Sequence, residues 1–276
     1  MDLALGGKTA FVTGGTDGIG LAIAQALAAE GVGVAVCGRD AARLDAAVSQ
    51  LAGSGARHEG AQHQGAQHQG VPVHGVQADV TDPVRLGEAV REAAERLGGL
   101  DLLVANAGGA SGGGLLDSTP DDWAYTYAVN VLHAANAIRA AVPYFERRGG
   151  GSALIIASVT GWKPGPRSSY ASAKAAEIHL AAALGQELGP RRIRVNALSP
   201  GSVLFEGGGW DEFRQARPER FAAFAREDFP MGRLVELREV TDVACFLLSD
   251  RASGINGANV CVDGGQDHPT AGRFFP

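Results

Sequence analysis

The fold is decided at residues 13–20, which read TGGTDGIG. A short apolar run at 9–12 precedes this stretch, and residues 19–30 follow it with apolar side chains at helical spacing. Gly14, Gly18 and Gly20 permit a tight turn, close approach of a pyrophosphate and packing of helix on strand. The N-terminus of the helix would direct free N–H groups at an anion. We therefore expect a dinucleotide-binding loop, with a tight turn that binds nothing as the alternative.

Apolar runs and helical patterns alternate along the rest of the chain. We predict strands at 9–12, 32–37, 71–77, 100–105, 152–157, 193–198 and 258–262, and helices at 19–30, 41–51, 83–97, 121–147, 169–188 and 239–248. Asp40 and Asp82 are the expected N-caps of the second and third helices. Such apolar strands need cover on both faces. The pattern therefore predicts an α/β fold: a doubly wound, mostly parallel, Rossmann-like sheet of about seven strands with helices on both faces.

No linker divides the chain, so we expect one dinucleotide-binding and catalytic domain over 1–276. A surface insertion is expected at about 53–75, where GAQHQ occurs twice in tandem at 60–69. The histidines there suggest a metal site, but no acidic or cysteine ligand supports it, and we expect no metal. These histidines are His58, His63, His68 and His74.

A second irregular segment, 202–233, is rich in aromatic residues and is expected to form a substrate lid, with the packing of one or two short helices as the alternative. Its aromatic residues are Phe205, Trp210, Phe213, Phe221, Phe224 and Phe229.

Composition excludes several classes of protein. The 276 residues are 45% hydrophobic and 20% charged, as in a globular protein, and the net charge of −6 predicts no nucleic-acid partner. No apolar run approaches the roughly 20 residues of a membrane span, so no membrane partner is expected. Three widely spaced cysteines and the absence of a signal peptide predict a cytoplasmic protein.

Three side chains suggest acid–base chemistry on a carbonyl or alcohol. Tyr170 and Lys174 stand four residues apart in a predicted helix and so share a face. A free tyrosine keeps its proton at neutral pH, and a neighbouring cation favours the phenolate, so Tyr170 could give or take a proton. Ser158 follows the fifth strand, at the edge where open α/β sheets bind ligands, and could donate to a substrate oxygen.

Seven motifs in register over residues 6–265 resemble the short-chain dehydrogenase/reductase family in its single-domain form, particularly 3-oxoacyl-carrier-protein reductase-like members. They are the glycine loop, Asp79-Val80, Asn106-Ala107-Gly108, Asn130, Ser158 with Tyr170-x-x-x-Lys174, the segment from Arg194 to Gly201, and Val262-Asp263-Gly264-Gly265. The chain departs from the family at Phe205, where relatives often carry Thr.

The resemblance implies an oxidoreductase that transfers hydride between a nicotinamide and a carbonyl or secondary alcohol. It implies a catalytic set of Asn130, Ser158, Tyr170 and Lys174, in which Asn130 joins a water-linked proton relay to Lys174. The implied coenzyme-binding residues are Gly14, Thr16, Asp17, Gly18, Ile19, Gly38, Arg39, Asp79, Val80, Asn106, Ala107, Gly108, Tyr170, Lys174, Pro200, Gly201 and Val203.

The resemblance also implies a homotetramer or homodimer, with the helices near 121–147 and 169–188 pairing across the interface. Two other functions are alternatives to this one. A nucleotide-sugar epimerase would need a larger substrate domain and a different glycine spacing. A catalytically silent coenzyme-binding sensor would not need the catalytic set.

The end of the second strand favours NADP(H), with NAD(H) possible. Gly38 stands where an NAD enzyme usually places an acidic residue, and Arg39 offers donors suited to a 2′-phosphate. Asp17, in the glycine loop, and Asp40, which could engage Arg39, count against this assignment.

Overall fold

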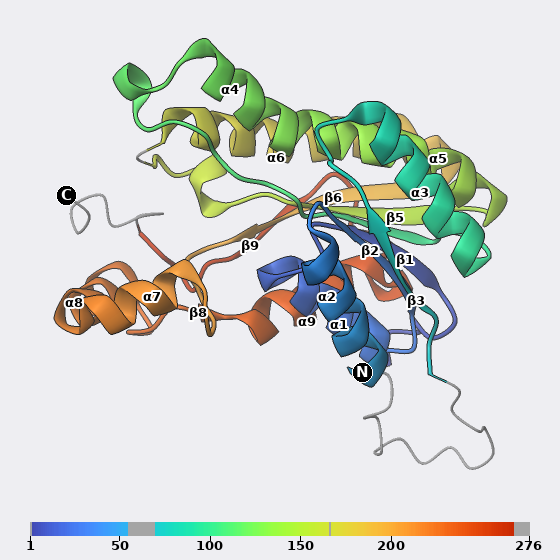
Figure 1. Ribbon diagram of the computed structural model, residues 1–276, viewed down its shortest axis with the longest axis horizontal. Helices are drawn as coiled ribbons and strands as arrows, with labels where there is room; N and C mark the ends of the chain where they lie inside the picture. Colours follow the sequence, from blue (N-terminus) through green and yellow to red (C-terminus); the bar gives the residue numbers. More distant parts are fainter. Residues whose placement is uncertain (1, 55–69, 166, 268–276) are drawn as a thin grey trace.

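The computed structural model describes residues 2–54, 70–165 and 167–267. Its main sheet contains seven parallel strands in the order β3-β2-β1-β4-β5-β6-β9 (Figure 1). The strands are β1 (Thr9–Thr13), β2 (Gly33–Gly38), β3 (Val73–Gln77), β4 (Leu102–Ala105), β5 (Gly151–Ile156), β6 (Ile193–Pro200) and β9 (Asn259–Val262). The strand order reverses between β1 and β4, and this reversal marks the usual ligand crevice of an open α/β sheet.

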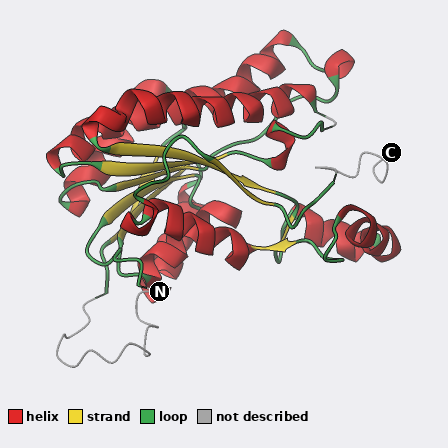
Figure 2. Cartoon of the chain, turned by 180° about the vertical axis from the view of Figure 1, so that it is seen from behind, coloured by secondary structure: helices red, strands yellow, loops and turns green. Residues whose placement is uncertain are grey.

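Two layers of helices cover the sheet (Figure 2). One face carries α1 (Gly18–Ala29), α2 (Ala41–Ser54) and α9 (Leu237–Leu248), and the other carries α3 (Pro83–Leu97), α5 (His133–Arg147) and α6 (Ser168–Leu188). Alternate residues of each strand enter the two cores: Ala10 and Val12 face α1, whereas Phe11 faces the α3 layer. The predicted doubly wound, seven-stranded fold is confirmed.

The predicted helix caps are also present. Asp82 accepts hydrogen bonds from the backbone of Val84 and Arg85 at the start of α3, and Asp40 accepts from Arg43 at the start of α2. The expected insertion at about 53–75 overlaps the end of α2 and the start of β3, while residues 55–69, including His58, His63, His68 and the tandem repeat, lie outside the described residues.

One predicted helix is wrong in detail. The continuous helix expected over 121–147 is divided into α4 (Pro120–Tyr127), a π-helical turn η2 (Ala128–Leu132) and α5. The sequence pattern does not reveal this turn, because a single π-helical turn differs from the α-helix in its hydrogen bonds over only a few residues. π-turns of this kind often occur at functional sites, and this one contains Asn130.

The segment expected as a lid folds into β7 (Val203–Leu204), α7 (Gly209–Ala216), α8 (Pro218–Asp228) and β8 (Val235–Glu236). Its aromatic rings pack against one another: Trp210 stacks on Phe224 at 4.6 Å between centroids, and Phe229 meets Phe224 edge-on. α7 and α8 stand out from the sheet on the same side as the tip of α4 (Figures 1 and 2). The ring contacts fit the alternative of packed short helices, and closure over a substrate stays a prediction.

Candidate active site

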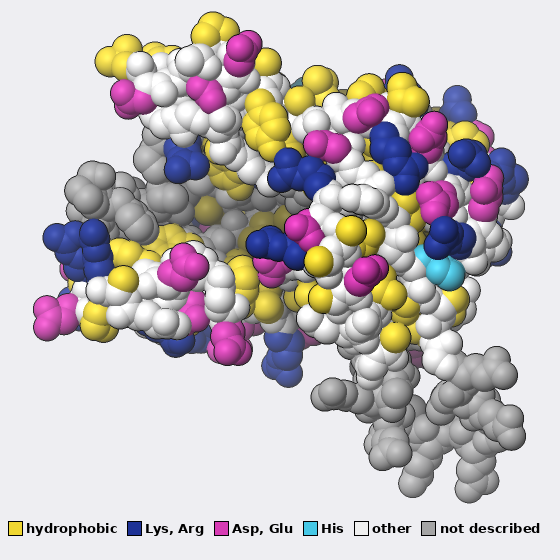
Figure 3. All heavy atoms as spheres, in the orientation of Figure 1, with side chains coloured by type: hydrophobic (Ala, Val, Ile, Leu, Met, Phe, Trp, Pro, Cys, Tyr) yellow, Lys and Arg dark blue, Asp and Glu magenta, His cyan; other side chains and the backbone are white. Residues whose placement is uncertain are grey.

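A pocket of about 270 Å³ opens at the carboxyl ends of β1 to β4. Its lining includes much of the predicted coenzyme set: Gly14, Thr16, Gly38, Arg39, Asp79, Val80, Asn106, Ala107 and Gly108. On this side of the molecule the surface is hollowed between the lobe that carries α4 and the lobe that carries α7 and α8 (Figure 3). The pocket therefore lies at the crevice that the reversal of strand order predicts.

Asn106 and Thr13 fix the glycine loop against the end of β4. The side-chain amide of Asn106 donates to the carbonyls of Thr13 and Gly14, each at 3.1 Å. The backbone N–H groups of Asn106 and Ala107 donate in return to Thr13 Oγ1 at 3.0 and 3.1 Å. These four bonds join the ends of β1 and β4, where the strand order reverses, and they fix the floor of the pocket.

Two glycines of the pocket leave no room for a side chain. Gly14 has φ of +61°, and a Cβ there would lie 2.9 Å from Ala107 Cα. A Cβ on Gly38 would lie 2.6 Å from a methyl carbon of Thr16. Gly38 therefore leaves no acidic side chain at its position to bind a ribose 2′-hydroxyl, and the charged side chains of Arg39 and Asp79 both line the pocket.

The other predicted coenzyme residues lie around this pocket without lining it. Asp17 caps α1, since its carboxylate accepts from the backbone N–H of Gly18 at 2.7 Å. Ile19 lies in the first turn of α1. Pro200 ends β6, Gly201 hydrogen-bonds to Val262, and Val203 is buried in β7.

Phe205 lies at the glycine loop. Its ring reaches to 3.4 Å from the position that a Cβ on Gly18 would occupy. The departure from the family at this position therefore places an apolar ring, rather than a hydroxyl, against the loop.

Lys174 is buried beside Tyr170 on α6, as the spacing predicts. Its ammonium lies 5.6 Å from the centroid of the Tyr170 ring and donates to the carbonyl of Ile156 at 2.8 Å. A Cβ on Gly108 would lie 3.3 Å from the Lys174 nitrogen and 2.8 Å from Asn130 Oδ1, so glycine is required there. Burial has the largest single effect on the pKa of Lys174 and lowers it. The attraction of Glu177, 2.9 Å away, and of Tyr170 together outweighs burial, so the net pKa lies above the ordinary lysine value.

Ser158 is prepared to donate a hydrogen bond. Its Oγ accepts from the backbone N–H of Thr160 at 3.2 Å and from the Thr160 hydroxyl at 3.0 Å. Because both bonds use lone pairs of Ser158, the hydroxyl proton is left for a substrate oxygen. Thr160 thus orients Ser158, a role that the sequence analysis missed and that a hydroxyl two residues after the predicted serine could have suggested.

Asn130 uses its side chain to build the π-turn. Its amide nitrogen donates to the carbonyls of Gly109 at 2.7 Å and Thr126 at 2.6 Å, and its Oδ1 accepts from the N–H of Gly109 at 3.3 Å. These contacts tie the turn to the loop after β4. The predicted proton relay through Asn130 stays a prediction.

His133 connects the π-turn to the glycine loop. Its Nδ1 lies 2.8 Å from the Asn130 carbonyl, which can only accept, so Nδ1 carries the proton. Its Nε2 then accepts from Thr13 Oγ1 at 3.1 Å. Burial, aided by the Lys174 charge, lowers the pKa of His133 to about 4, and the ring is neutral at physiological pH.

Tyr125 and Glu177 are further residues that the sequence analysis missed. Tyr125, on α4, lines the coenzyme pocket, although it belongs to none of the seven motifs. Glu177 is 0% exposed and contacts Lys174 from three residues further along α6. An acidic residue within one turn of Tyr170-x-x-x-Lys174 was a visible signal for it.

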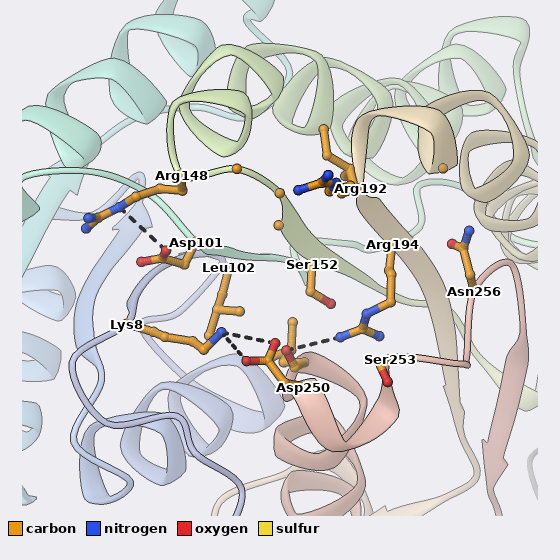
Figure 4. Close-up of a pocket in the computed structure, with 16 residues that line it drawn as sticks. Lys8, Asp101, Leu102, Arg148, Ser152, Arg192, Arg194, Asp250, Ser253 and Asn256 are labelled. Atoms are coloured by element: carbon orange, nitrogen blue, oxygen red, sulfur yellow. Dashed lines mark hydrogen bonds and ion pairs between the residues drawn. The ribbon is translucent and has the colours of Figure 1, made fainter.

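A larger pocket, of about 480 Å³, lies at the opposite, amino edge of the sheet (Figure 4). Its charged side chains are engaged in structural contacts: Lys8 pairs with Asp250 at 3.0 Å, and Arg148 pairs with Asp101 at 3.5 Å. Arg194 donates to the carbonyls of Leu247, Leu248 and Ser249 at the end of α9. These contacts cap a helix C-terminus and join the base of the fold. We therefore assign the functional site to the carboxyl edge.

In the part of the chain that the structure describes, no cluster of His, Cys, Asp and Glu side chains could hold a metal ion. Within the same residues, none of the helices has both the length and the apolarity to cross a bilayer.

Comparison with known proteins identifies the family. The family model described as enoyl-(acyl carrier protein) reductase matches residues 14–267. Dehydrogenase/reductase SDR family member 4 of Mus musculus is 36% identical over 265 residues, which cover 95% of this chain and 88% of the relative. The chain belongs to the short-chain dehydrogenase/reductase family. The resemblance predicted from the seven motifs is thereby confirmed.

Solved structures of short-chain dehydrogenases/reductases superimpose on the whole fold. L-Sorbose reductase from Gluconobacter frateurii, complexed with NADPH and L-sorbose, is 30% identical with a TM-score of 0.85, and the alignment covers 96% of this chain and 98% of that one. A 7α-hydroxysteroid dehydrogenase, complexed with NADH and 7-oxo glycochenodeoxycholic acid, is 28% identical with a TM-score of 0.84, covering 98% and 97%.

The buried, neutral His133 makes stability depend on pH. A histidine in the unfolded chain titrates near pH 6.5, whereas the folded ring resists protonation until about pH 4. Between these values the unfolded state binds more protons, so the free energy of unfolding falls as pH falls. We expect a loss of about 2 kcal/mol from His133 between about pH 7 and pH 5.

Urea unfolding of the parent and of His133→Gln at both pH values measures this contribution. The variant should lack that part of the pH dependence, while His179→Gln, on the same face of the sheet, should retain it. Equal pH dependence in the parent and in His133→Gln would show that folding does not lower the pKa of His133.

Proposed function

We propose that this protein is an NADP(H)-preferring oxidoreductase that transfers hydride between the nicotinamide and the carbon of a carbonyl or secondary alcohol. As a short-chain dehydrogenase/reductase it is a nicotinamide-dependent enzyme of CH–OH and C=O groups. The observation that carries the residue assignment is the buried Lys174 ammonium beside Tyr170, at the same sheet edge as the coenzyme pocket. The relatives found are dehydrogenases and reductases, and nothing supports the catalytically silent alternative.

The proposed chemistry divides between the coenzyme and four side chains. The bound nicotinamide supplies or accepts the hydride. Tyr170 gives a proton to the substrate oxygen in reduction and takes it back in oxidation. Ser158 donates a hydrogen bond to the same oxygen and stabilises the charge that develops on it. Lys174 favours the phenolate that Tyr170 leaves behind, and Asn130 holds the π-turn against the loop after β4.

The coenzyme preference rests on the end of β2. Gly38 cannot bear a side chain against Thr16, so no carboxylate repels a 2′-phosphate there. Arg39 is exposed at the rim of the pocket, and a guanidinium suits phosphate. Of the two residues that counted against NADP(H), Asp17 is engaged with the N-terminus of α1 and Asp40 with the N-terminus of α2. NADPH occupies one of the similar structures and NADH another, so NAD(H) remains the second coenzyme.

The remaining proposals concern the chain's organisation. We propose one coenzyme-binding and catalytic domain, with a surface insertion at about 53–75 and residues 202–233 covering a small-molecule carbonyl or alcohol substrate. We also propose a cytoplasmic homotetramer or homodimer whose subunits pair through α4, α5 and α6. The exposed apolar side chain of Leu132, at the junction of α4 and α5, supports that interface.

Replacing Tyr170 with Phe should abolish most of the reaction. The variant loses the proton donor and keeps the ring, so we expect kcat to fall by roughly 10²–10⁴-fold with the coenzyme Kd nearly unchanged. Steady-state assays on a carbonyl panel and a coenzyme titration measure the two quantities. Tyr144→Phe, which alters a tyrosine on α5 away from the pocket, is the matched control. Near-parental kcat in Tyr170→Phe would refute the mechanism.

The coenzyme assignment is measured by kcat/KM with NADPH and with NADH. We expect the parent to prefer NADPH and Arg39→Ala to lose mainly that preference, with a penalty of about 10-fold or more for the lost charged hydrogen bonds. Arg43→Ala removes an exposed guanidinium from the next turn of the chain and should change neither value. A parent that prefers NADH would overturn the assignment.

A further inference from the structure

Glu177 is a buried carboxylate whose charged partner is the proposed catalytic lysine. It is 0% exposed, and its Oε2 lies 2.9 Å from the Lys174 nitrogen. Neither carboxylate oxygen has a hydrogen-bond partner of good geometry among the described residues, so the contact with Lys174 is ionic. Burying a carboxylate in this way is costly, and a buried ion pair often stabilises a fold no better than apolar side chains do. Stability alone is therefore a poor explanation for Glu177.

The charge of Glu177 lies close to Tyr170, the proposed proton donor, with Lys174 between them. Lys174 stands between Glu177 and Tyr170 on one face of α6, three residues from the first and four from the second. An unopposed ammonium draws the proton away from a neighbouring tyrosine. A carboxylate in contact with that ammonium offsets part of its field and therefore opposes this effect.

No other charged side chain competes for this role in the described part of α6's surroundings. η2, the turn after Ser158 (Val159–Gly161), β5 and β9 carry no lysine, arginine, aspartate or glutamate. On α5, His133 faces the Lys174 charge and is neutral, because its pKa is lowered to about 4. On β6, Arg194 is bound to the carbonyls at the far edge of the sheet.

Further titratable side chains lie on the other neighbours of α6. On α4, Asp121 is exposed, Tyr127 is half-buried, Asp122 is bound to Ser111 and Thr119, and Tyr125 faces the coenzyme pocket. At the far end of α6, Arg191 pairs with Glu146 on the surface.

We propose that Glu177 is a positioning residue for the reaction: its carboxylate offsets the Lys174 charge beside Tyr170 and so adjusts the proton transfer that accompanies carbonyl reduction. This inference rests on the proposed function. In reduction the carbonyl carbon gains hydride, the carbonyl oxygen gains the Tyr170 proton, and solvent then returns a proton to the phenolate. A protonated Tyr170 is the form that begins this sequence, whereas alcohol oxidation begins from the phenolate.

The test compares the pH dependence of kcat in the parent and in Glu177→Gln, which keeps the side-chain size and removes the charge. The substitution removes the negative charge of Glu177. Tyr170 and Lys174 are coupled, and each releases a proton more easily without that charge, so the prediction does not depend on which of them titrates. The midpoints for reduction and for alcohol oxidation should therefore both move to lower pH, by on the order of 1 pH unit. Glu177→Asp, which retains the charge, should stay nearer the parent.

A second readout does not need turnover. The near-ultraviolet absorbance of tyrosinate, titrated with pH and corrected with Tyr170→Phe, should show its midpoint moving in the same direction in Glu177→Gln. Glu187→Gln, on the exposed face of α6, is the matched control and should change neither readout. A variant that merely loosens the helix would lower Tm without moving these midpoints.

The results with Glu177→Gln and Tyr170→Phe distinguish failure of this inference from failure of the proposed function. A folded Glu177→Gln with parental midpoints, alongside an inactive Tyr170→Phe, overturns the role of Glu177 and leaves the proposed function standing. An active Tyr170→Phe overturns the function itself. If Glu177→Gln does not fold, Glu177→Met replaces the carboxylate with an apolar side chain of similar length, and failure of both to fold would make Glu177 structural and overturn the inference.

Discussion

The hydroxyl of Thr13 is the contact on which the site depends. It accepts the backbone N–H groups of Asn106 and Ala107, and it donates to His133. Through these bonds the end of β1 holds the end of β4, and both are joined to the π-turn that presents Asn130. A parallel sheet by itself supplies only a crevice where its strand order reverses. The buried threonine converts that crevice into a fixed cradle, because every donor and acceptor around it is satisfied.

The charges of the site are arranged around a single buried cation. Lys174 has little exposure, its ammonium is held by the Ile156 carbonyl, and it influences Tyr170, Glu177 and His133 from one position. Burial raises the pKa of Glu177 against the pull of Lys174, and it lowers that of His133. Low dielectric strengthens each of these couplings. The proton chemistry proposed for Tyr170 is therefore a property of the group, rather than of the tyrosine alone.

Sequence reasoning predicted the sheet, most helices and the pocket lining because those features follow from local patterns. Apolar strands, Asp82 before Pro83 and the glycine loop each carry their signal within a few residues. The π-turn at Asn130 was not predicted, since a single wider turn changes the hydrogen bonds of only a few residues within an otherwise helical segment. The contacts of Tyr125 and His133 also escaped, because they join elements that are distant in sequence. The aromatic composition of residues 202–233 suggested a lid. Composition alone does not show whether aromatic rings contact a substrate or one another, and Trp210 and Phe224 stack on each other.

The central claim is that this carboxyl-edge site passes hydride to a carbonyl carbon while its side chains manage the proton. It is tested most directly with NADPH carrying deuterium at the transferable position, incubated with the enzyme and a panel of ketones and aldehydes. Mass spectrometry of the products locates the label. The account predicts one deuterium on the carbinol carbon for each coenzyme oxidised. Coenzyme oxidation without deuterium in any alcohol, or no oxidation with any carbonyl and either coenzyme, would contradict it.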